Sequence, residues 1–469
     1  MKLEGIHSVY FLGIGGIGMS ALARWFHQAG YAVAGYDRTP SPLTDQLFDE
    51  GIAISFEDQV STIPENFLRD KNGLLVIWTP AIPKESALYQ FFSSGSFTMK
   101  KRSEVLGMLT AEHYTIAVAG THGKTTTSSL IAHLLKSAGK PVTAFLGGIT
   151  QNYQSNLILN SSKEATIMVV EADEFDRSFL RLHPDVEVVT SADPDHLDIY
   201  GDESTILDGF REFIQLLKKK GKLLIQDKAA SKIGQDNLPQ KGTKIYGLRA
   251  TSGIYAENVQ ARPGSFAFEY EDGKVQIKNL ELFIPGFHNV ENALSAIAIS
   301  LDHGLSPQEI KTGLATFRGV KRRFEILVQE GSRVYIDDYA HHPEEIRACL
   351  SSVRAMYPGK KLTVVFQPHL FSRTRDFAEG FSESLSLADQ VLLLDIYPAR
   401  ELPIPGVSSE MLFDDIQASN KKMVTKEQLF DVLEDWDPEI LVTMGAGDID
   451  RLVPRVQDWM RSRLKPQVL

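Results

Sequence analysis

The sequence predicts an α/β protein built from three domains. The chain has 469 residues, which is more than one hydrophobic core usually holds and suggests about three domains. Two glycine-rich segments, residues 13–18 and 120–123, each separate an apolar, strand-like run from a helical pattern. Towards the C-terminus, several apolar runs end in polar residues, as parallel strands do along the ligand-binding edge of a sheet. We expect domains over residues 1–109, 110–322 and 323–469.

Composition narrows the class of protein. Lys and Arg number 49 against 60 Asp and Glu, a net charge of −11, which argues against nucleic acid as the main partner. The single cysteine, Cys349, excludes an internal disulfide framework. The sequence contains no run of about 18 apolar residues, the length that spans a bilayer. We therefore expect a soluble, cytoplasmic protein without a membrane partner. As a separate expectation, we take the protein to be a monomer or a weak homodimer.

The first domain begins with a nucleotide-binding pattern. Residues 7–12 form a buried-strand pattern, and Gly13–Gly18 fits G-x-G-x-x-G. A helical pattern over 19–29 and a second strand over 32–36 follow, and that strand ends at Asp37. Glycines allow the backbone to approach a diphosphate, the helix N-terminus attracts it, and an acid at this place commonly binds a ribose. The pattern predicts a Rossmann-like domain.

The second glycine-rich segment predicts a phosphate site. Gly120–Thr127 lies between a strand-like run, 114–119, and a helical pattern, 128–135. Backbone N–H groups and the helix N-terminus would face an anion, Lys124 would supply a positive charge, and the Thr125 hydroxyl can hold Mg²⁺. We expect a central P-loop ATP-binding α/β domain.

Two later strands lead to candidate metal ligands. The apolar run 165–170 ends in Glu171, at the place where an acid that orders Mg²⁺ belongs beside a phosphate loop. The acidic residues that follow are interpreted as a solvated loop: Asp173, Glu174 and Asp176. The run 186–192 is followed by His196. A lone histidine is usually structural, but the end of a parallel strand makes this one a candidate metal or substrate contact.

Other polar residues have both a structural and a functional interpretation. Asn289 and Asn292, three residues apart, can present amides to a purine, although Asn289 alone can be a helix N-cap. Arg102 and Arg323 lie in basic segments, which are most often solvated. Beside a nucleotide site, Arg102 can reach a phosphate, and Arg323 can bind a phosphoryl group in transfer.

The last third predicts a second Rossmann-like sheet. Four apolar runs, 333–336, 362–366, 390–394 and 439–444, each end in polar residues. Because the carboxyl ends of parallel strands meet at one edge, we expect a site along that edge.

These motifs in order resemble the Mur ligases of peptidoglycan synthesis over essentially the whole chain, most closely the branch that uses L-alanine. The segments that carry the resemblance are 13–20, 120–127, 171–174, 195–198, 288–292, 322–325, 337–343 and 367–376. The resemblance implies an N-terminal domain for UDP-N-acetylmuramate, a central domain for ATP and a C-terminal domain for L-alanine. It implies that ATP converts the lactyl carboxylate to an acyl phosphate, which the alanine amine attacks.

The resemblance also implies roles for individual residues. ATP would bind at Gly120, Thr121, His122, Gly123, Lys124, Thr125, Thr126, Asn289, Asn292, Arg323 and Asp337. The UDP-sugar would bind at Gly15, Gly16, Ser20, Asp37, Arg102 and His122, and L-alanine at His341 and Arg373. Mg²⁺, with Mn²⁺ as an alternative, would bind at Thr125, Glu171 and His196. The catalytic set would be Lys124, His196 and Arg323. Leu370 stands where some relatives have arginine, so alanine recognition would rely more on Arg373.

Three alternatives remain at this stage. A recycling ligase that joins a preformed tripeptide to the same UDP-sugar shares several motifs, but residues 367–376 and 396–401 favour the alanine branch. A nicotinamide-dependent oxidoreductase would explain Gly13–Gly18 and Asp37, yet it leaves the phosphate loop without a role. A non-catalytic scaffold predicts that Lys124→Ala leaves function intact.

Overall fold

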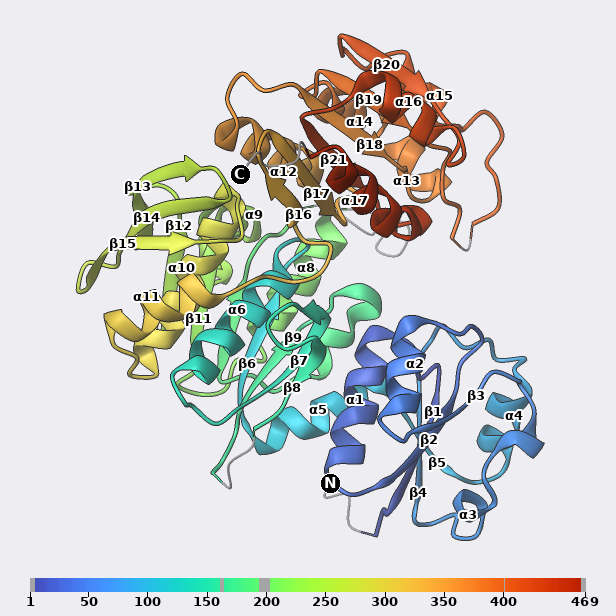
Figure 1. Ribbon diagram of the computed structural model, residues 1–469. Coiled ribbons are helices and arrows are strands. Elements are labelled where there is room, and N and C mark those ends of the chain that lie inside the picture. The colour runs from blue at the N-terminus through green and yellow to red at the C-terminus, as the bar shows by residue number, and fades with distance from the viewer. Residues whose placement is uncertain (1–4, 161–163, 194–202, 400, 465–469) are drawn as a thin grey trace, which may run out of the picture. The chain divides into compact units, whose positions relative to one another are not determined.

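The computed structural model describes residues 5–160, 164–193, 203–399 and 401–464 (Figure 1). It divides into two compact units, one made of the chain up to residue 246 plus 295–310, the other of 247–294 and the chain from 311 onwards. Helices alternate with strands in both units, and parallel pairing dominates the large sheets. The predicted α/β class is therefore confirmed.

The first sheet is a five-stranded parallel sheet in the order β3-β2-β1-β4-β5. Its strands are β1 (Ser8–Leu12), β2 (Ala32–Tyr36), β3 (Ala53–Ser55), β4 (Leu74–Trp78) and β5 (Thr98–Lys101). Its helices are α1 (Ile17–Gln28), α2 (Pro42–Asp49), α3 (Glu65–Leu68), α4 (Ala87–Ser94) and α5 (Arg102–Glu112). Strands β1 and β4 are apolar runs buried almost throughout, as expected for parallel strands covered on both faces.

The same unit contains the strands that carry the phosphate loop. Their order is β12-β11-β10-β6-β9-β7-β8, with β8 alone antiparallel to its neighbour. The strands are β6 (Tyr114–Ala119), β7 (Val142–Thr150), β8 (Ser155–Ile158), β9 (Ile167–Glu171), β10 (Val186–Val189), β11 (Lys222–Gln226) and β12 (Thr243–Gly247). The helices are α6 (Lys124–Ser137), η2 (Phe175–Arg181), α8 (Glu203–Ile214) and α9 (Asp227–Ile233). The phosphate loop follows β6, which lies between β9 and β10, so the strand ends after residues 171 and 189 flank it.

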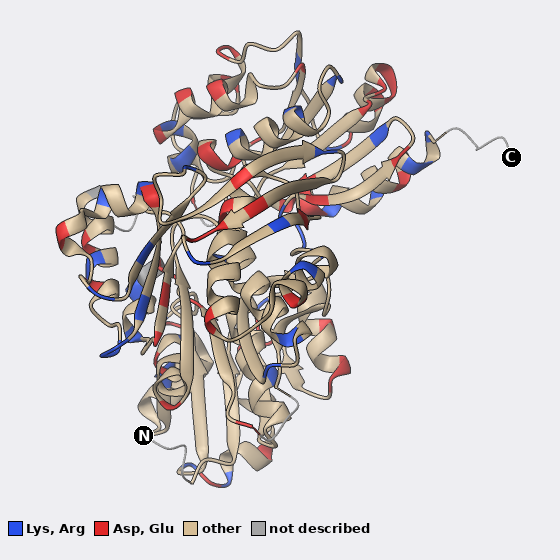
Figure 2. Ribbon diagram, turned by 90° about the vertical axis from the view of Figure 1, so that its left-hand side faces the viewer, with Lys and Arg blue, Asp and Glu red and all other residues tan. Residues whose placement is uncertain are grey.

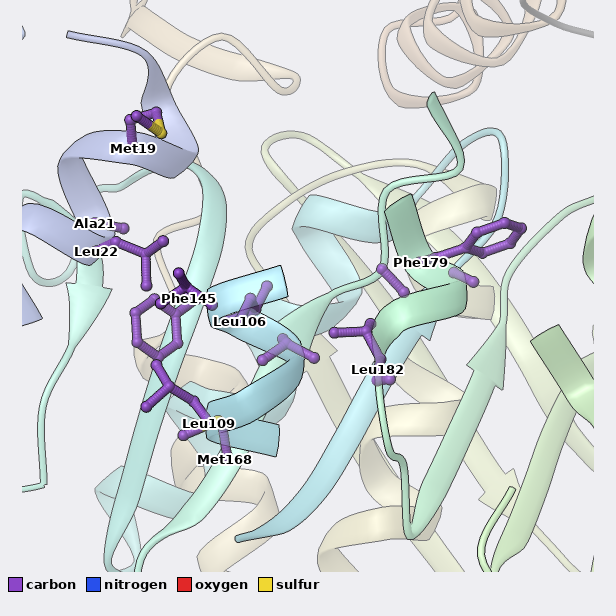
Figure 3. Packing of buried hydrophobic residues seen from close by; sticks show 14 of the residues in the cluster. Met19, Ala21, Leu22, Leu106, Leu109, Phe145, Met168, Phe179 and Leu182 are labelled. Carbon is purple, nitrogen blue, oxygen red and sulfur yellow. The ribbon is translucent and has the colours of Figure 1, made fainter. Parts of the chain in front are cut away.

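One hydrophobic cluster packs the elements of this unit together (Figure 3). Met19, Ala21 and Leu22 of α1 belong to it, and so do Phe145 of β7 and Met168 of β9. Figure 3 shows Leu22 of α1 directed towards the Phe145 ring. The helix after the first glycine loop is thus in the same core as strands beside the second.

The other unit has an antiparallel meander and a six-stranded sheet. The meander is β13 (Ile254–Arg262), β14 (Ser265–Glu271) and β15 (Gln276–Leu282). The sheet has the order β16-β17-β21-β18-β19-β20, and only β16 is antiparallel. Its strands are β16 (Glu325–Glu330), β17 (Arg333–Asp338), β18 (Leu362–Phe366), β19 (Gln390–Leu393), β20 (Asn420–Met423) and β21 (Ile440–Met444). Four of these, β17, β18, β19 and β21, are the strands predicted to form a parallel sheet, and that prediction is confirmed.

Helices lie between these strands in sequence, and one more follows the last strand. They are α12 (Pro343–Met356), α13 (Phe371–Asp376), α14 (Ala378–Leu385), α15 (Glu410–Phe413), α16 (Leu429–Trp436) and α17 (Val453–Ser462). Two further helices, α10 (Phe287–Asp302) and α11 (Pro307–Thr316), follow the meander in sequence. Strand β17 is longer than the predicted run 333–336, so Asp337 and Asp338 lie inside the strand and not after it.

Charge is distributed over both units. Figure 2 shows Lys and Arg interspersed with Asp and Glu along the chain rather than gathered in one basic stripe. Among the helices in the described part of the chain, none combines the length and apolar character needed to cross a membrane.

Candidate active site

The phosphate loop is held in shape by two hydroxyl side chains that follow β10. Ser191 Oγ accepts a hydrogen bond from the His122 amide at 2.7 Å and lies 2.9 Å from Thr121 Oγ1. Thr190 Oγ1 donates to the carbonyl of Ala119 at 3.1 Å. Gly120 has a φ of +134°, and a Cβ there would lie 2.2 Å from the Thr190 hydroxyl, so only glycine fits. These contacts join the loop to the residues that follow β10.

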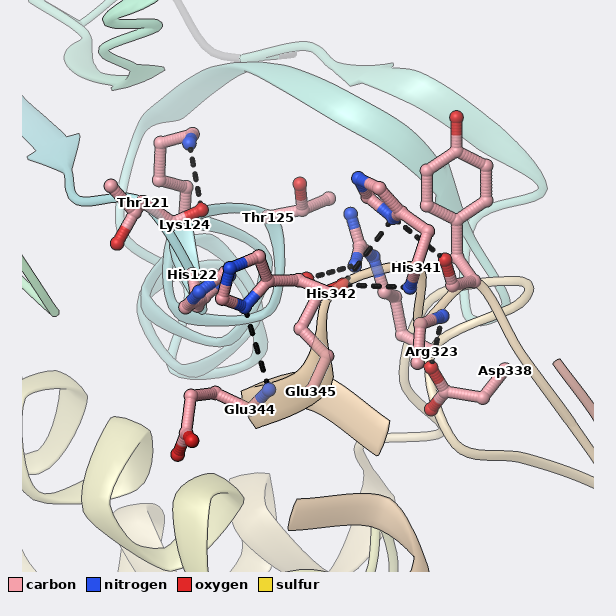
Figure 4. A network of polar contacts seen from close by, with 12 residues as sticks. Thr121, His122, Lys124, Thr125, Arg323, Asp338, His341, His342, Glu344 and Glu345 are labelled. Carbon is pink, nitrogen blue, oxygen red and sulfur yellow. Dashed lines mark hydrogen bonds and ion pairs between the residues drawn. The ribbon is translucent and has the colours of Figure 1, made fainter. Parts of the chain in front are cut away.

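Lys124, the first residue of α6, is paired with a buried carboxylate. Its Nζ donates to Glu174 Oε1 at 2.8 Å and to the Gly120 carbonyl at 2.6 Å. Burial acts to lower the pKa of Lys124, but the negative charges of Glu174, Asp173 and Glu171 outweigh it, so the pKa lies above its ordinary value. The lysine is therefore held charged at the start of the helix, where Figure 4 shows it beside Thr121, His122 and Thr125.

This pair corrects one sequence prediction. Glu174 was expected in a solvated loop, but its side chain is 2% exposed because the chain turns back onto the lysine before η2. Asp173 is more open, at 41%, and lies 3.5 Å from Arg102 Nη2. Sequence reasoning missed Glu174 because a run of acids gives no signal of which one is buried.

Thr125 and Glu171, two predicted metal ligands, lie together. Thr125 Oγ1 donates to Glu171 Oε1 at 3.0 Å, and the other carboxylate oxygen accepts from the Gly147 amide at 2.9 Å. A hydroxyl and a carboxylate are the oxygen donors that Mg²⁺ prefers, so this pair fits such an ion. The third predicted ligand, His196, lies outside the described residues. Across residues 5–160, 164–193, 203–399 and 401–464, no group of three or more His, Cys, Asp or Glu is arranged around a metal position.

The first glycine loop is closed by Asp37. Its Oδ2 accepts from the Gly15 amide at 2.7 Å, and a Cβ on Gly15 would lie 2.9 Å from that oxygen. Arg102, at the start of α5, lies against the other end of the loop, since a Cβ on Gly18 would come within 2.7 Å of Nη1. Gly16 is the N-cap of α1. The structure therefore places Asp37 and Arg102 against the same glycine loop.

Ser20, a predicted UDP-sugar contact, lies deeper than the loop surface. It is fully buried, donates to the Ile17 carbonyl at 3.0 Å and accepts from Asn156 Nδ2 at 2.9 Å. Its hydroxyl thus takes part in packing between α1 and β8. Asn156 and its second neighbour, Arg24, carried no sequence signal, because their contacts join residues more than 130 positions apart.

In the C-terminal unit, Glu345 gathers two predicted site residues. Its carboxylate lies 3.7 Å from Arg323 Nη1 and 3.3 Å from His341 Nδ1. The Arg323 guanidinium lies 5.0 Å from the centre of the Tyr339 ring, and the Tyr339 carbonyl is 2.9 Å from His341 Nδ1. Figure 4 shows Arg323, His341 and Glu345 close together at the start of α12. The sequence analysis did not single out Glu345, although it contacts both of these candidates.

Two adjacent aspartates anchor this region. Asp337 is fully buried and accepts from Arg322 Nε at 3.0 Å and from the Thr443 hydroxyl at 2.7 Å. Asp338 accepts from the backbone amides of residues 324 and 340, each at 2.7 Å, and burial raises its pKa to about 7. Asp338 thereby ties the backbone beside Arg323 to the backbone beside His341.

The remaining predicted residues are buried on helices. Asn289 and Asn292 lie on the first turns of α10, where Asn289 Nδ2 donates to the Pro285 carbonyl at 2.7 Å and Asn292 Nδ2 to Asn289 Oδ1 at 3.4 Å. Because α10 begins at Phe287, the alternative that Asn289 is the N-cap is wrong. Arg373 lies on α13 and is 8% exposed.

Three family models match the chain in consecutive order. The Mur ligase family catalytic domain matches residues 8–114, the Mur ligase middle domain 118–300, and the Mur ligase glutamate ligase domain 322–447. Together they account for most of the sequence.

Relatives of known name match almost the whole chain. The UDP-N-acetylmuramate–L-alanine ligase of Christiangramia forsetii is 48% identical, over 97% of this chain and 98% of that protein. The ligase of the same name from Flavobacterium psychrophilum is 49% identical, over 97% and 99%. Among solved structures, the Thermotoga maritima UDP-N-acetylmuramate-alanine ligase MurC has a TM-score of 0.79 at 27% identity, covering 97% of this chain and 100% of that one. The agreement of sequence, fold and motif order along the whole chain shows that this protein belongs to the Mur ligase family, and is an ATP-dependent ligase.

Proposed function

We propose that the protein joins L-alanine to the lactyl carboxylate of UDP-N-acetylmuramate and converts ATP to ADP and phosphate, as a step in making peptidoglycan precursors. The observation that carries this proposal is near-half identity, over nearly full length, to ligases whose names state these substrates. The charged lysine of the phosphate loop supports it further. ATP and nucleotide sugars are used in the cytoplasm, which is the location we propose.

The residues of the phosphate loop suit the first chemical step. A carboxylate is a poor electrophile, so it is first phosphorylated, and transfer of the γ-phosphoryl group onto an anion brings negative charges together. Lys124 is held charged by Glu174 and can offset that repulsion. Thr125 and Glu171 would hold Mg²⁺, with Mn²⁺ as an alternative, and a bound cation supplies charge neutralisation at the phosphates. His196 is proposed as a further ligand.

The glycine loop with Asp37 and Arg102 is proposed to bind the UDP part of the sugar nucleotide. Asp37 can accept from ribose hydroxyls, and Arg102 can pair with a phosphate. Ser20, in the first turn of α1, is proposed as a further contact of the sugar nucleotide. His122, within the phosphate loop, is proposed to face the reacting part of the sugar nucleotide.

The C-terminal unit is proposed to supply the amino-acid site. His341 and Arg373 would bind L-alanine, with the guanidinium taking the carboxylate, preferably as a bidentate pair. Leu370 leaves this recognition to Arg373 rather than to a neighbouring arginine. Arg323, Asp337, Asn289 and Asn292 are proposed ATP contacts. The domain limits 1–109, 110–322 and 323–469, and a monomer or weak homodimer, are part of the proposal.

The deciding experiment measures phosphate release from ATP in the presence of UDP-N-acetylmuramate and a panel of amino acids. We expect release that depends on L-alanine and formation of the alanyl product by mass spectrometry. Activity with a tripeptide but not with L-alanine would show a recycling ligase instead. Tight NAD(H) binding without any ATP-dependent ligation would show an oxidoreductase. Lys124→Ala serves as the inactive control.

A further inference from the structure

Asn156 of β8 is bonded to one face of helix α1. It is fully buried, and its Nδ2 donates to the Ile17 carbonyl at 2.5 Å and to Ser20 Oγ at 2.9 Å. Its Oδ1 accepts from Arg24 Nη1 at 2.5 Å. Residues 17, 20 and 24 follow helical spacing, so they share a face of α1. A side-chain amide can donate two hydrogen bonds through its nitrogen and accept others through its oxygen. Asn156 donates two and accepts one.

Arg24 extends the connection to a second helix. Its Nε donates to both carboxylate oxygens of Glu50, at 2.8 and 2.9 Å, and its Nη2 to Gln46 Oε1 at 3.2 Å. Gln46 lies on α2 and Glu50 at its C-terminal end. Arg24 is 6% exposed, and breaking the partners of a buried charge is costly. We call Asn156, Arg24, Gln46 and Glu50 the α1 latch.

The latch connects the two loops that the proposed reaction uses. Helix α1 begins directly after the first glycine loop, with Gly16 as its N-cap. On the other side, β8 pairs with β7, and the β7 residue Gly147 donates its amide to Glu171, which in turn accepts from Thr125 in the phosphate loop. Hydrogen bonds, strand pairing and the covalent chain therefore link the first glycine loop to the phosphate loop.

We propose that Asn156 is a positioning residue that sets the spacing between these two loops. The inference rests on the proposed function, in which one substrate is held by its UDP end on the first loop and phosphorylated at its carboxylate beside the second. Phosphoryl transfer needs the reacting atoms about 3–3.5 Å apart and in line, so an error in the spacing of the loops passes directly to the reacting atoms. Asn156 contacts neither loop's ligand in this role, and acts only through α1 and β7.

The kinetic test compares Asn156→Ala with Asn156→Asp. We expect Asn156→Ala to lower kcat about 10- to 100-fold, because a shift of about 1 Å can cost a hundredfold, while the affinity for ATP alone stays within about twofold. Asn156→Asp keeps the acceptor for Arg24 but loses both donors, so an intermediate loss is expected. Asn160→Ala is the matched control, since Asn160 follows the same strand and its Nδ2 donates locally to the Glu164 carbonyl. Each variant is assayed at the same interval below its own Tm.

A second measurement separates failure of the latch from failure of the proposed function. Amide hydrogen exchange of the full, ligand-free chain should become at least about tenfold faster in α1 and β8 of Asn156→Ala, with α6 unchanged. A lowered Tm with an unchanged kcat would overturn the inference. If the wild-type protein shows no ligation with these substrates, the proposed function fails, and the inference fails with it, while selective exchange would still show that the latch exists. Exchange that is unchanged, or that is faster throughout the protein, would show that Asn156 does not hold α1 and β8 together.

Discussion

The two glycine-rich loops of this ligase share a backbone plan and differ in the side chains around it. Each follows a buried parallel strand, turns at glycines with positive φ, +89° at Gly13 and +134° at Gly120, and leads into a helix. The phosphate loop adds Lys124, charged and paired with buried Glu174. The first loop has no lysine, and Asp37 takes one of its amides. Both loops have the backbone geometry that suits an anion. In the proposed function, the neighbouring side chains decide which loop reacts with a triphosphate and which holds a diphosphate.

The largest effect is expected when Lys124, the side chain that distinguishes the phosphate loop, is removed. Lys124→Ala should lower kcat by about 10²–10³-fold or more, because the developing charge on the phosphoryl group loses its cation. It should also destabilise the fold by about 3–5 kcal/mol, since Glu174 is left buried without its cation. Coupled phosphate-release assays and urea unfolding measure the two effects.

The double variant Lys124→Ala/Glu174→Gln separates these effects. We expect it to recover most of the lost stability and none of the activity. Recovery of activity would mean that the lysine has only a structural role, and the contrast between the loops would disappear.

The next largest effect is expected from a substitution beside the first glycine loop, and it should change only the binding of the UDP-sugar. Arg102→Ala should raise KM for the UDP-sugar about 10- to 100-fold, because a charge-assisted hydrogen bond to the ligand is lost. KM for ATP should stay unchanged. Lys100→Ala, in the same basic segment, is the control with little expected effect. Equal increases in both KM values would contradict the assignment of one loop to each nucleotide.

A smaller effect tests the metal position at the phosphate loop. Glu171→Gln should raise the Mg²⁺ concentration for half-maximal activity at least about tenfold, because a charged oxygen ligand is lost beside Thr125. Affinity for the UDP-sugar should stay the same in calorimetry. The exposed Glu164→Gln variant is the control, and an unchanged Mg²⁺ requirement in Glu171→Gln would exclude the proposed ligand.

The smallest effect is expected on stability, and it comes from a buried acid in the sheet that carries the phosphate loop. Strands β1, β2 and β4 carry no charged residue, whereas β10 carries Glu187, which is fully buried and whose carboxylate has no hydrogen-bond partner among the residues that the structure describes. Burial raises the pKa of Glu187 well above its ordinary value. The contribution of Glu187 to stability is therefore most favourable below the unfolded pKa of about 4.3, and it becomes less favourable as pH rises towards the folded pKa.

Replacement of this carboxyl should remove that dependence. Glu187→Leu should stabilise the protein by about 1–3 kcal/mol at pH 7, with the gain shrinking as pH falls towards 4. Urea unfolding over a pH series measures it, and Glu187→Gln separates the loss of the titrating group from the gain of apolar burial. A gain that is equal at pH 4 and pH 7 would show that titration is not involved.

Much of the site could be predicted because its signals are local. Thr125 and Glu171 were both expected as metal ligands, one from the loop pattern and one from its place after an apolar strand, and they lie 3.0 Å apart. Asp37 and Arg102 were expected near the first loop and lie against it. Glu171 and Asp37 each follow an apolar strand, and Thr125 follows a glycine-rich loop, so short sequence patterns indicate these three. Arg102 lies in a basic segment, and its place at this loop was implied by the family resemblance.

The residues that were missed depend on distant partners. Glu174 is one acid among several in its segment, and only the folded chain shows that it is the one turned onto Lys124. Glu345 gathers Arg323 and His341 from separate segments, and Asn156 bonds to α1 across more than 130 residues. None of these side chains stands out in its own sequence context.

The sequence by itself determined the α/β class, the glycine turns, the parallel strands and the residues at their carboxyl ends, because periodicity and turn chemistry act over a few residues. Only the tertiary structure decided which carboxyl groups are buried and paired, and how the first glycine loop is connected to the second. The physical reason is that the energy of a buried charge or amide depends on the partners that folding brings to it, and such partners can lie anywhere along the chain.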